Sequence, residues 1–567
     1  MFRRVLIANR GEIAVRVART CHDLGIEVVA VYSDVDEGSR HVAAADRSVH
    51  LPGTLPAETY LNVPAILDAA TSTGAEAIHP GYGFLSERAD AAEATLATGL
   101  VWIGPPPSAS AAAGDKVRAR RLADEVGVAP VPGTLEPVTG ADEVLLFAER
   151  HGYPVAIKAA GGGGGRGLRV AASAEDVAGA LESAIREATE YFGSGEVYLE
   201  RYLPRPKHVE VQVLSPPAGR AVWLGARDCS LQRRHQKLVE ETPPPRFADL
   251  VPSMGAAAVA VANACGYVNA GTVEFLVDTE DSTFYFLEIN ARLQVEHTIT
   301  EEVLGLDLVA AQLRVAAGED PGIAQGDVRP GGRLEPRGHA IECRINAENP
   351  ARGFLPSPGR IVTYREPGGP GVRVDSGFGA GDTIPPAYDS LIAKLIVLGA
   401  TREEARRRML RALAEFDIEG VRTTIPAHRV LLEDPAFVDG SYTTQTVEGG
   451  ALDSIMSGTV PAAGDTAPRA ATRGGITARL WNPAVGRRGA GPADAVGSRA
   501  VIAPMHGTLL EVLVKPGDVV EAGDPVAVLE AMKMETRVTA TAAGTVKEVN
   551  TKPGSVVEAG EPIAVVE

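Results

Sequence analysis

The sequence predicts an α/β protein of several domains that ends in a small all-β domain. Its 567 residues are enough for roughly three to five folding units, each with its own core. Strand-like and helix-like segments alternate over about the first hundred residues, which is typical of a doubly wound parallel sheet. Two-residue alternation dominates the middle of the chain, up to about residue 448, and the last 61 residues contain an internal repeat.

Composition and charge exclude several classes of protein. The 55 basic and 73 acidic residues give a net charge of −18, which opposes the phosphate neutralisation that non-specific nucleic-acid binding needs. No run of the sequence approaches the roughly 18–20 apolar residues of a membrane-spanning helix. The four cysteines lie far apart without a C-x-x-C motif, and we interpret Cys229 and Cys343 as packing residues. We therefore expect a cytoplasmic protein that binds neither nucleic acid nor membrane.

The first α/β unit places two polar segments at strand ends. Its predicted strands lie at 4–9, 27–32 and 77–79, and its first helix lies at 13–24. Ligands of doubly wound sheets bind beyond the carboxyl ends of the strands. Asn9–Glu12 and His79–Gly83 fall at such ends, so they are candidates for a ligand site.

A glycine run marks a second α/β unit, from about Asp115 to Leu203. Val155–Lys158 spells the lysine motif of protein kinases, but the other kinase motifs are missing from the sequence. Here the glycines Gly161–Gly165 follow the lysine, with Arg166 directly after them. The backbone N–H groups of such a run can approach phosphate oxygens, which favours a phosphate-binding loop over a plain linker.

Two carboxylates and an amide are predicted to converge on a hairpin. Two strand-like runs flank a turn near Asp281, and Glu274 and Glu288 are each seven residues from it. Folding the hairpin there sets the two carboxylates opposite each other, with Asn290 on the same face. Such oxygen ligands suit Mg²⁺ or Mn²⁺ shared with nucleotide phosphates.

Polar alternation continues beyond this hairpin through Arg292, Gln294 and Glu296 to His297. In a lone strand, this pattern would indicate one solvated face. Because the partner strand places the Glu274 carboxylate opposite this stretch, we interpret the stretch as one strand with a catalytic face.

Two further polar groupings fit the same site. His208, Glu210 and Gln212 alternate along a predicted strand, and Arg227–Lys237 contains five cationic or potentially cationic residues in eleven positions. The basic run is either a salt-bridged surface or the positive side of a phosphate pocket.

A composition shift separates the C-terminal domain from the rest. Of the 43 residues from Ser457 to Arg499, 22 are Ala, Gly or Pro, and their net charge is +4. Such a stretch cannot bury enough apolar surface to offset its ordering entropy, so it is interpreted as a linker. Within this linker, Ile476–Trp481 is the candidate for a short ordered segment.

The last residues form a duplicated sequence. Gly507–Glu530 aligns without gaps on Gly544–Glu567, at an offset of 37, with 16 of 24 positions identical. About 24 residues cannot sustain a core alone, so the halves are predicted to share one core in a symmetric β-sandwich. Ala531–Glu535 joins the halves and is predicted to form an exposed hairpin tip. Its centre, Lys533, is not duplicated, which favours a special role over an ordinary surface position.

Together these residues resemble the biotin carboxylases of the ATP-grasp superfamily, from Met1 to about Glu448. The resemblance rests on Ile7–Glu12, His79–Glu87, the glycine run, Gln232–Lys237 and Leu287–His297. The tail, with Glu530–Met534, resembles a biotinyl carrier domain, and its Met-Lys-Met distinguishes it from lipoyl domains. The whole chain resembles the α subunit of an acyl-CoA carboxylase of the acetyl- or propionyl-CoA class. Its departures from the family pattern, expected to matter little, are at Ala291, Thr298 and His506.

The resemblance implies a role for each site residue. It assigns ATP binding to Lys116, Lys158, Gly162, Gly163, Gly164, Gly165, Glu200, Leu203, His208, Gln232 and His235. It assigns Mg²⁺ or Mn²⁺ to Glu274, Glu288 and Asn290. It assigns bicarbonate or biotin to Tyr82, Lys237, Arg292, Gln294 and Val295. Glu296 is implied to be the general base, Arg344 to lie beside the ureido oxygen of biotin, and Lys533 to carry that biotin covalently.

The implied fold is α/β plus α+β, with a biotin carboxylase before a flexible linker and a biotinyl/lipoyl-like sandwich. The implied boundaries are 1–114 for the doubly wound N-terminal domain, 115–203 for the ATP-grasp lid, 204–448 for the mixed C-terminal domain, 449–499 for the linker and 500–567 for the carrier. The implied activity is ATP- and bicarbonate-dependent carboxylation of the chain's own biotin, with a carboxyltransferase β subunit, a biotin protein ligase and further copies of the chain as partners. The alternative is a carrier with an inactive ATP-grasp scaffold, or a ligase for another carboxylate. The intact general base, metal ligands and carrier lysine favour carboxylation of the chain's own biotin over this alternative.

Overall fold

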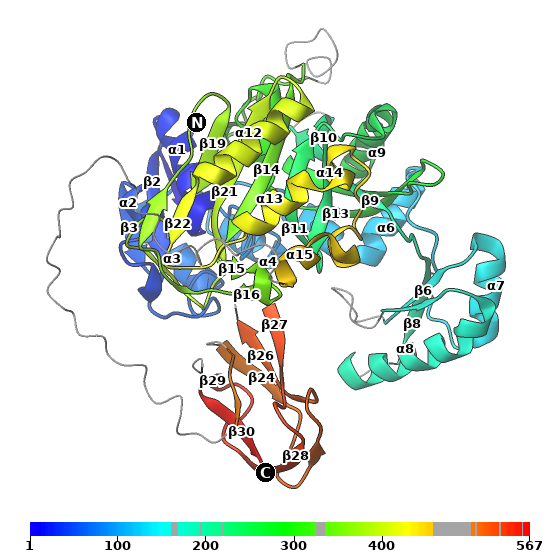
Figure 1. Ribbon diagram of the computed structural model, residues 1–567. Coiled ribbons are helices and arrows are strands. Elements are labelled where there is room, and N and C mark those ends of the chain that lie inside the picture. Colours follow the sequence, from blue (N-terminus) through cyan, green and yellow to red (C-terminus); the bar gives the residue numbers. More distant parts are fainter. Residues whose placement is uncertain are drawn as a thin grey trace, which may run out of the picture.

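Figure 1 shows the computed structural model of the chain. It describes residues 1–134, 136–159, 168–192, 195–217, 220–324, 335–457, 500–504, 507–531, 534–557 and 560–567. Several predictions fall outside these residues: the glycine loop at Gly162–Gly165, most of the linker with Ile476–Trp481, and Lys533.

The N-terminal part is a doubly wound parallel sheet in the order β3-β2-β1-β4-β5, which confirms the predicted fold class. Its elements are β1 (Arg4–Ile7), α1 (Gly11–Asp23), β2 (Glu27–Tyr32), α2 (Arg40–Ala43), β3 (Arg47–His50), α3 (Val63–Thr73), β4 (Ala77–His79), α4 (Ala89–Ala97) and β5 (Val101–Trp102). The Asn9 amide donates to the Pro80 and Tyr82 carbonyls, each at 2.7 Å, and so joins the two polar strand ends. A Cβ at Gly81 (φ 63°) would lie 2.9 Å from that amide, so this turn requires glycine.

A smaller unit with its own core follows. It contains α7 (Ala141–His151), β6 (Val155–Ala159), β7 (Leu168–Ala171), α8 (Val177–Phe192) and β8 (Val197–Arg201). The preceding helices α5 (Pro107–Gly114) and α6 (Lys116–Glu125) belong instead to a core of the main body. The antiparallel sheet β7-β6-β8 packs against α7 and α8 around residues such as Phe147, Ile157 and Leu199. Figure 1 shows this unit set to one side of the main body.

The largest sheet is antiparallel, in the order β13-β12-β9-β10-β11-β14-β21-β19. Its strands are β9 (Lys207–Ser215), β10 (Val222–Arg233), β11 (Gln236–Thr242), β12 (Asn269–Val277), β13 (Phe284–Asn290), β14 (His339–Asn346), β19 (Val372–Ser376) and β21 (Leu391–Gly399). The helices of this region are α9 (Val251–Ala264), α10 (His297–Leu304), α11 (Leu308–Ala316), α12 (Arg402–Glu415), α13 (Ile425–Glu433), α14 (Pro435–Val438) and α15 (Asp453–Met456). Its short strands are β15 (Glu348–Asn349), β16 (Leu355–Pro356), β17 (Gly359–Arg360), β18 (Thr363–Arg365), β20 (Thr383–Ile384) and β22 (Asp417–Glu419).

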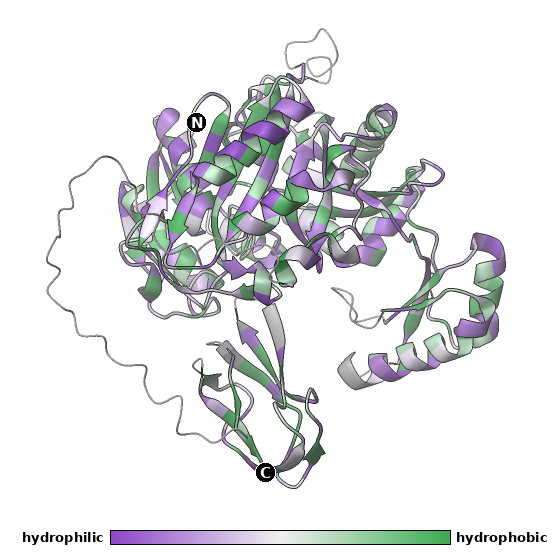
Figure 2. Ribbon diagram, in the orientation of Figure 1, coloured by the Kyte–Doolittle hydropathy of each residue, from purple (hydrophilic) through white to green (hydrophobic). Residues whose placement is uncertain are grey.

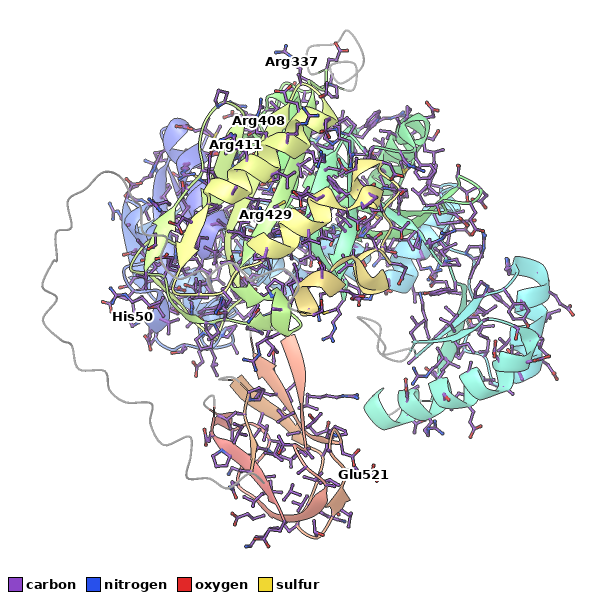
Figure 3. The ribbon with its side chains drawn as sticks, viewed as in Figure 1. His50, Arg337, Arg408, Arg411, Arg429 and Glu521 are labelled. Atoms are coloured by element: carbon purple, nitrogen blue, oxygen red, sulfur yellow. The ribbon has the colours of Figure 1, made fainter. Side chains whose placement is uncertain are left out.

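Helix α12 shows how this sheet is covered. Ala405, Met409 and Ala412 recur at helical spacing and are buried against the sheet. In Figure 2 the helix accordingly mixes hydrophobic and hydrophilic residues, whereas the strands beneath it are mainly hydrophobic. Arg408 and Arg411, labelled in Figure 3, lie along the same helix and pair with carboxylates one turn away.

The predicted strand that was to carry the catalytic face is shorter than expected. β13 ends at Asn290, residues 291–296 are irregular, and α10 begins at His297. A straight strand would carry Glu296 away from the carboxylates of β12. A turn, closed by a hydrogen bond from the His297 N–H to the Gln294 carbonyl (3.3 Å), brings it back. The interpretation of 288–296 as one strand face is therefore wrong, although its polar side chains are still gathered in one place.

The C-terminal domain is the predicted symmetric sandwich. Its sheets are β23-β30-β28-β25 and β27-β26-β24-β29. The strands are β23 (Ala500–Ile502), β24 (Gly507–Val512), β25 (Val519–Val520), β26 (Pro525–Ala531), β27 (Met534–Thr539), β28 (Gly544–Val549), β29 (Val556–Val557) and β30 (Pro562–Val566). β24, β25 and β26 begin 37 residues before β28, β29 and β30, so the repeat appears strand by strand. Both halves contribute to one core, for example Leu509 and Val546.

All four cysteines, Cys21, Cys229, Cys265 and Cys343, are unpaired and buried. Burial raises the pKa of each thiol, in Cys21 to about 12. Within the part of the chain that the structure describes, no helix has the length and apolar character needed to cross a bilayer.

Candidate active site

The predicted carboxylate hairpin is present. Glu274 on β12 lies directly opposite Glu288 on β13, which confirms the expected pairing. His208, on the neighbouring strand β9, has its Nε2 2.7 Å from Glu274 Oε2. Lys116, at the start of α6, has its Nζ 3.7 Å from Glu288 Oε2. Each carboxylate thus has a cationic or potentially cationic neighbour.

Lys237 on β11 is the centre of the charged cluster. Its Nζ donates to Glu210 (2.6 Å), Glu274 (3.0 Å) and Glu296 (2.6 Å). Burial alone would lower the pKa of Lys237, but the three carboxylates outweigh it and hold that pKa well above its usual value. The ammonium is therefore permanently charged and fixes three carboxylates from three different segments.

Glu296 is fully buried between two cations. Its Oε1 accepts from Lys237 and its Oε2 accepts from the Arg344 guanidinium at 2.9 Å. Burial raises the pKa of Glu296, but Lys237 and Arg344 outweigh this and hold it well below the usual range. The carboxylate is consequently held in its ionised form. Cys229, interpreted from the sequence as a packing residue, lies with its Sγ 3.9 Å from Glu296 Oε1.

Arg344 on β14 connects Glu296 to a second pair of carboxylates. Its Nε donates to Glu240 Oε1 at 2.6 Å. Burial raises the pKa of Glu240 to about 8, with Arg344 opposing and the nearby Glu342 adding to the rise. Thr298, one of the departures from the family pattern, donates a hydrogen bond to Glu342.

The residues after β13 form a hydrogen-bonded chain. Arg292 donates to Gln294 Oε1 (2.8 Å) and to Asn290 Oδ1 (3.2 Å), and its Nε is 3.3 Å from Glu87 Oε1. Gln294 in turn donates to Glu274 Oε1 at 3.1 Å. Arg292 and Gln294 thus join the site as the sequence predicted, through a turn instead of a strand.

The two ends of the basic run 227–237 have different surroundings: Lys237 lies in the charged cluster, whereas Arg227 lies inside the sheet. Arg227 is fully buried and donates to Glu210 (2.6 Å), Gln212 (2.7 Å) and Thr300 (2.9 Å). It therefore serves as an internal counter-charge for Glu210, its direct partner across β9 and β10. The sequence had placed both Arg227 and Glu210 in polar groupings that fit the site, but it gave neither residue a role. The alternation on β9 was visible in the sequence, but the cross-strand pairing that joins the two was not.

The predicted nucleotide residues are spread over two units. Lys158 Nζ lies 2.7 Å from Glu200 Oε1, and Arg120 also contacts this carboxylate. Neither Lys158 nor Glu200 has a described hydrogen bond or ion pair with the carboxylates of the large sheet. The remaining predicted contacts are Leu203 and Gln232, both buried, and the exposed His235 at the β10–β11 turn.

A buried lysine that the sequence did not indicate supports the site from behind. Lys394 on β21 is fully buried and donates to the carbonyl of Val295 at 2.9 Å. Its Nζ is also 3.4 Å from Glu12 on α1 and 5.9 Å from the centre of the Tyr82 ring. Burial raises the pKa of Glu12 to about 7, with Lys394 opposing. Lys394 thus connects the N-terminal sheet to the loop that contains Gln294 and Glu296.

The hairpin oxygens fit a divalent cation. Among the described residues, the ion-pair partner of Glu288 is Lys116, at 3.7 Å, and Glu288 lies directly opposite the carboxylate of Glu274. Carboxylate and amide oxygens suit Mg²⁺ or Mn²⁺. Two other groups have ligand atoms within 4.8 Å, His208 with Glu210 and Glu274, and Glu210 with Cys229 and Glu296. Both already contain the Lys237 ammonium, so they fit a cation less well.

Comparison with known families accounts for almost the whole chain. Matching profiles are the biotin carboxylase N-terminal domain (residues 1–109), the ATP-binding domain of the carbamoyl-phosphate synthase L chain (115–322), the biotin carboxylase C-terminal domain (342–449) and the biotin-requiring enzyme domain (499–566). A biotin-dependent acyl-coenzyme A carboxylase alpha3 subunit of Mycobacterium leprae is 46% identical, over 95% of this chain and 94% of its own. Biotin carboxylase 1 of Bacillus subtilis is 48% identical, over 79% of this chain and 98% of its own.

Solved structures agree with these relatives. The biotin carboxylase domain of Hydrogenobacter thermophilus 2-oxoglutarate carboxylase, in complex with MgADP, ADP and bicarbonate, has a TM-score of 0.73 and 44% identity. The match covers 80% of this chain and 99% of that one.

Fold and site together define a biotin carboxylase joined to a biotinyl carrier domain, an enzyme that uses ATP, bicarbonate, a divalent metal ion and biotin. The chain belongs to the family of biotin-dependent carboxylases, and the resemblance to acyl-coenzyme A carboxylase α subunits that the sequence indicated is confirmed.

Proposed function

We propose that the chain carboxylates the biotin of its own carrier as the first half-reaction of an acyl-CoA carboxylase, of the acetyl- or propionyl-CoA class. The observation that carries this proposal is the ionised Glu296, buried between Lys237 and Arg344. A separate carboxyltransferase β subunit performs the second half-reaction.

Each residue of the cluster then has a role in activating bicarbonate. Glu296 accepts the proton of bicarbonate, whose oxygen attacks the γ-phosphorus of ATP. The bond from that phosphorus to the bridging β–γ oxygen breaks, so that ADP leaves and a mixed anhydride of carbonate and phosphate forms. Lys237, Arg292, Gln294 and the Val295 backbone hold the bicarbonate anion. Glu274, Glu288 and Asn290 would hold a divalent ion, which would supply neutralisation of the charge that develops on the phosphates.

Transfer to biotin uses the other side of Glu296. The mixed anhydride breaks down to CO₂ and phosphate, and the phosphate takes the proton of the ureido nitrogen of biotin, which then attacks CO₂ to form carboxybiotin. As the proton leaves, the neighbouring ureido oxygen becomes enolate-like. The Arg344 guanidinium beside it stabilises that charge, because a fixed cation in a water-poor site is worth more than in solvent. Tyr82, whose buried hydroxyl has no hydrogen-bond partner among the described residues, is proposed as a donor to bicarbonate or biotin.

Nucleotide binding is proposed for the residues that the family resemblance assigned. These are Lys116, Lys158, Gly162–Gly165, Glu200, Leu203, His208, Gln232 and His235. Lys533 is the proposed biotinylation site, modified by a biotin protein ligase. Support comes from the paired strands β26 and β27, which end at Ala531 and Met534 and leave only two residues between them. We also propose that the chain assembles with further copies of itself and that it is located in the cytoplasm.

ATP cleavage tests the function directly. We expect hydrolysis of ATP by the Lys533→Arg chain, which lacks the proposed biotin attachment site, to depend on both bicarbonate and added free biotin. Hydrolysis without such dependence would indicate a ligase for another carboxylate, and no hydrolysis would indicate a scaffold. Purification with native partners, followed by assays with acetyl-CoA and propionyl-CoA, identifies the acyl substrate.

A further inference from the structure

A short hairpin beside the active site is built around one buried aromatic residue. In it β15 pairs with β16, with Asn349 opposite Leu355. The turn places both Gly353 (φ 64°) and Phe354 (φ 61°) in the left-handed region, which is unusual for a bulky residue. Phe354 is buried in the core of the main body, and the Arg233 guanidinium lies 4.8 Å from the centre of its ring.

The next residue, Leu355, faces a different partner. It is half-buried, and it packs against the hydrophobic core of the C-terminal carrier domain. Figure 1 shows the carrier with β26 and β27 directed at this hairpin. These are the two strands that flank Lys533. Because Phe354 already fills the core of the body, Leu355 is not needed there, and its apolar side chain is available to the carrier.

The hairpin is also attached to the elements of the active site. Arg344 on β14 and Asn349 on β15 are five residues apart, so the span between them is at most roughly 17 Å. Arg233, which stacks on Phe354, ends β10 and opens the turn that leads to Lys237. A carrier held at Leu355 is therefore close to the residues around Glu296.

We propose that the β15–β16 hairpin, through Leu355, is the seat on which the carrier docks while its biotinyl-lysine enters the active site. The proposal rests on the proposed function and adds the place where the carrier is received. A contact centred on one leucine is weak, which lets the carrier leave. A tether that keeps the carrier at roughly millimolar effective concentration is enough to populate such a contact.

The test compares carboxylation of the attached biotin with carboxylation of free biotin. Leu355→Glu places a charge against the apolar carrier surface. In single-turnover experiments on the biotinylated full chain with radiolabelled bicarbonate, we expect labelling of the carrier to slow by about tenfold, equivalent to about 1.4 kcal/mol of contact free energy. Free biotin, assayed in a Lys533→Arg background, is expected to be carboxylated at the wild-type rate.

Two matched variants complete the design. Leu355→Met keeps an apolar side chain of similar volume and is expected to retain rapid labelling of the carrier. Val362→Glu puts the same charge on a side chain of the main body that is 67% exposed and belongs to no core cluster, so both rates should stay at the wild-type level.

The outcomes separate the seat from the function. The seat is refuted if Leu355→Glu labels its carrier as fast as Val362→Glu does. It is also refuted if the rates with attached and free biotin fall together, because Leu355 would then act through the active site or the fold. A wild-type chain that carboxylates neither form of biotin would overturn the proposed function itself.

Discussion

Replacing Glu296 with glutamine removes one negative charge from the centre of the site and leaves the shape of the side chain nearly unchanged. Glu296 is fully buried, 2.6 Å from the Lys237 ammonium and 2.9 Å from the Arg344 guanidinium. Glutamine can still accept from one of these cations, but it cannot take a proton from bicarbonate.

The expected loss of rate is that of a general base, on the order of 10²–10⁴ in ATP cleavage. Affinity for MgATP should change little. The described contacts of Glu296 are with Lys237, Arg344 and Cys229, none of which is a proposed metal ligand.

Bicarbonate-dependent ATP cleavage measures the first quantity and calorimetric titration with MgATP the second. Glu288→Gln is the matched control: it also neutralises one carboxylate, but it should weaken MgATP binding together with turnover. Equal losses of MgATP affinity in the two variants would make Glu296 a metal ligand and refute its assignment as the base. The thermal unfolding midpoint verifies that both variants are folded.

Four further outcomes are expected. Lys533→Arg should abolish both avidin binding and carboxylation of the chain, and label on any other lysine would contradict a single biotinylation site. Removing about thirty residues from 457–499 should spare ATP cleavage with free biotin but slow acyl-CoA carboxylation with the partner, since the carrier must reach a second protein. Lys394→Met should cost about 3–5 kcal/mol in chemical denaturation, because it leaves Glu12 buried without its cation. Adding Glu12→Gln to Lys394→Met should recover part of that cost. If the costs of the two substitutions simply add, Lys394 and Glu12 are not coupled. His41 is buried, and burial lowers its pKa to about 4. Below pH 6.5 the unfolded chain takes up a proton there that the folded chain does not, so stability falls as the pH drops from about 6.5 to about 4, by up to about 3 kcal/mol. His41→Gln should flatten this part of the pH profile of the unfolding midpoint.

Local pairings were readable from the sequence. Glu274 and Glu288 are 14 residues apart in one hairpin, and counting from the turn was enough to place them opposite each other. The carrier repeat was equally direct, because a duplicated sequence at a constant offset yields duplicated strands.

The errors arose where one pattern is compatible with two backbones. Alternating polar residues from Glu288 to Glu296 suit a strand, but they suit an irregular loop as well when each polar side chain has a buried partner. Whether Glu296 turns back toward Lys237 depends on tertiary contacts that local periodicity does not contain.

Long-range partners had no signal in the sequence. Lys394 contacts a carbonyl 99 positions earlier in the chain. Arg227 belonged to a basic run that the sequence left open as a surface or as one side of a phosphate pocket, and its register opposite Glu210 makes it a buried counter-ion. Burying a charge is tolerated where a partner of opposite charge is already present, and that partner is known only after the strands are ordered.

The buried cysteines make the chain convenient for labelling. A thiol reacts as its thiolate, and all four native thiols are enclosed with pKa values raised by burial. Cysteines introduced at Val362, which is 67% exposed on the main body, and at Val519, which is 80% exposed on the carrier, would therefore be the accessible thiols of an otherwise unreactive protein. A pair of fluorophores at these two positions would report the distance between carrier and main body during turnover, without any native cysteine having to be removed.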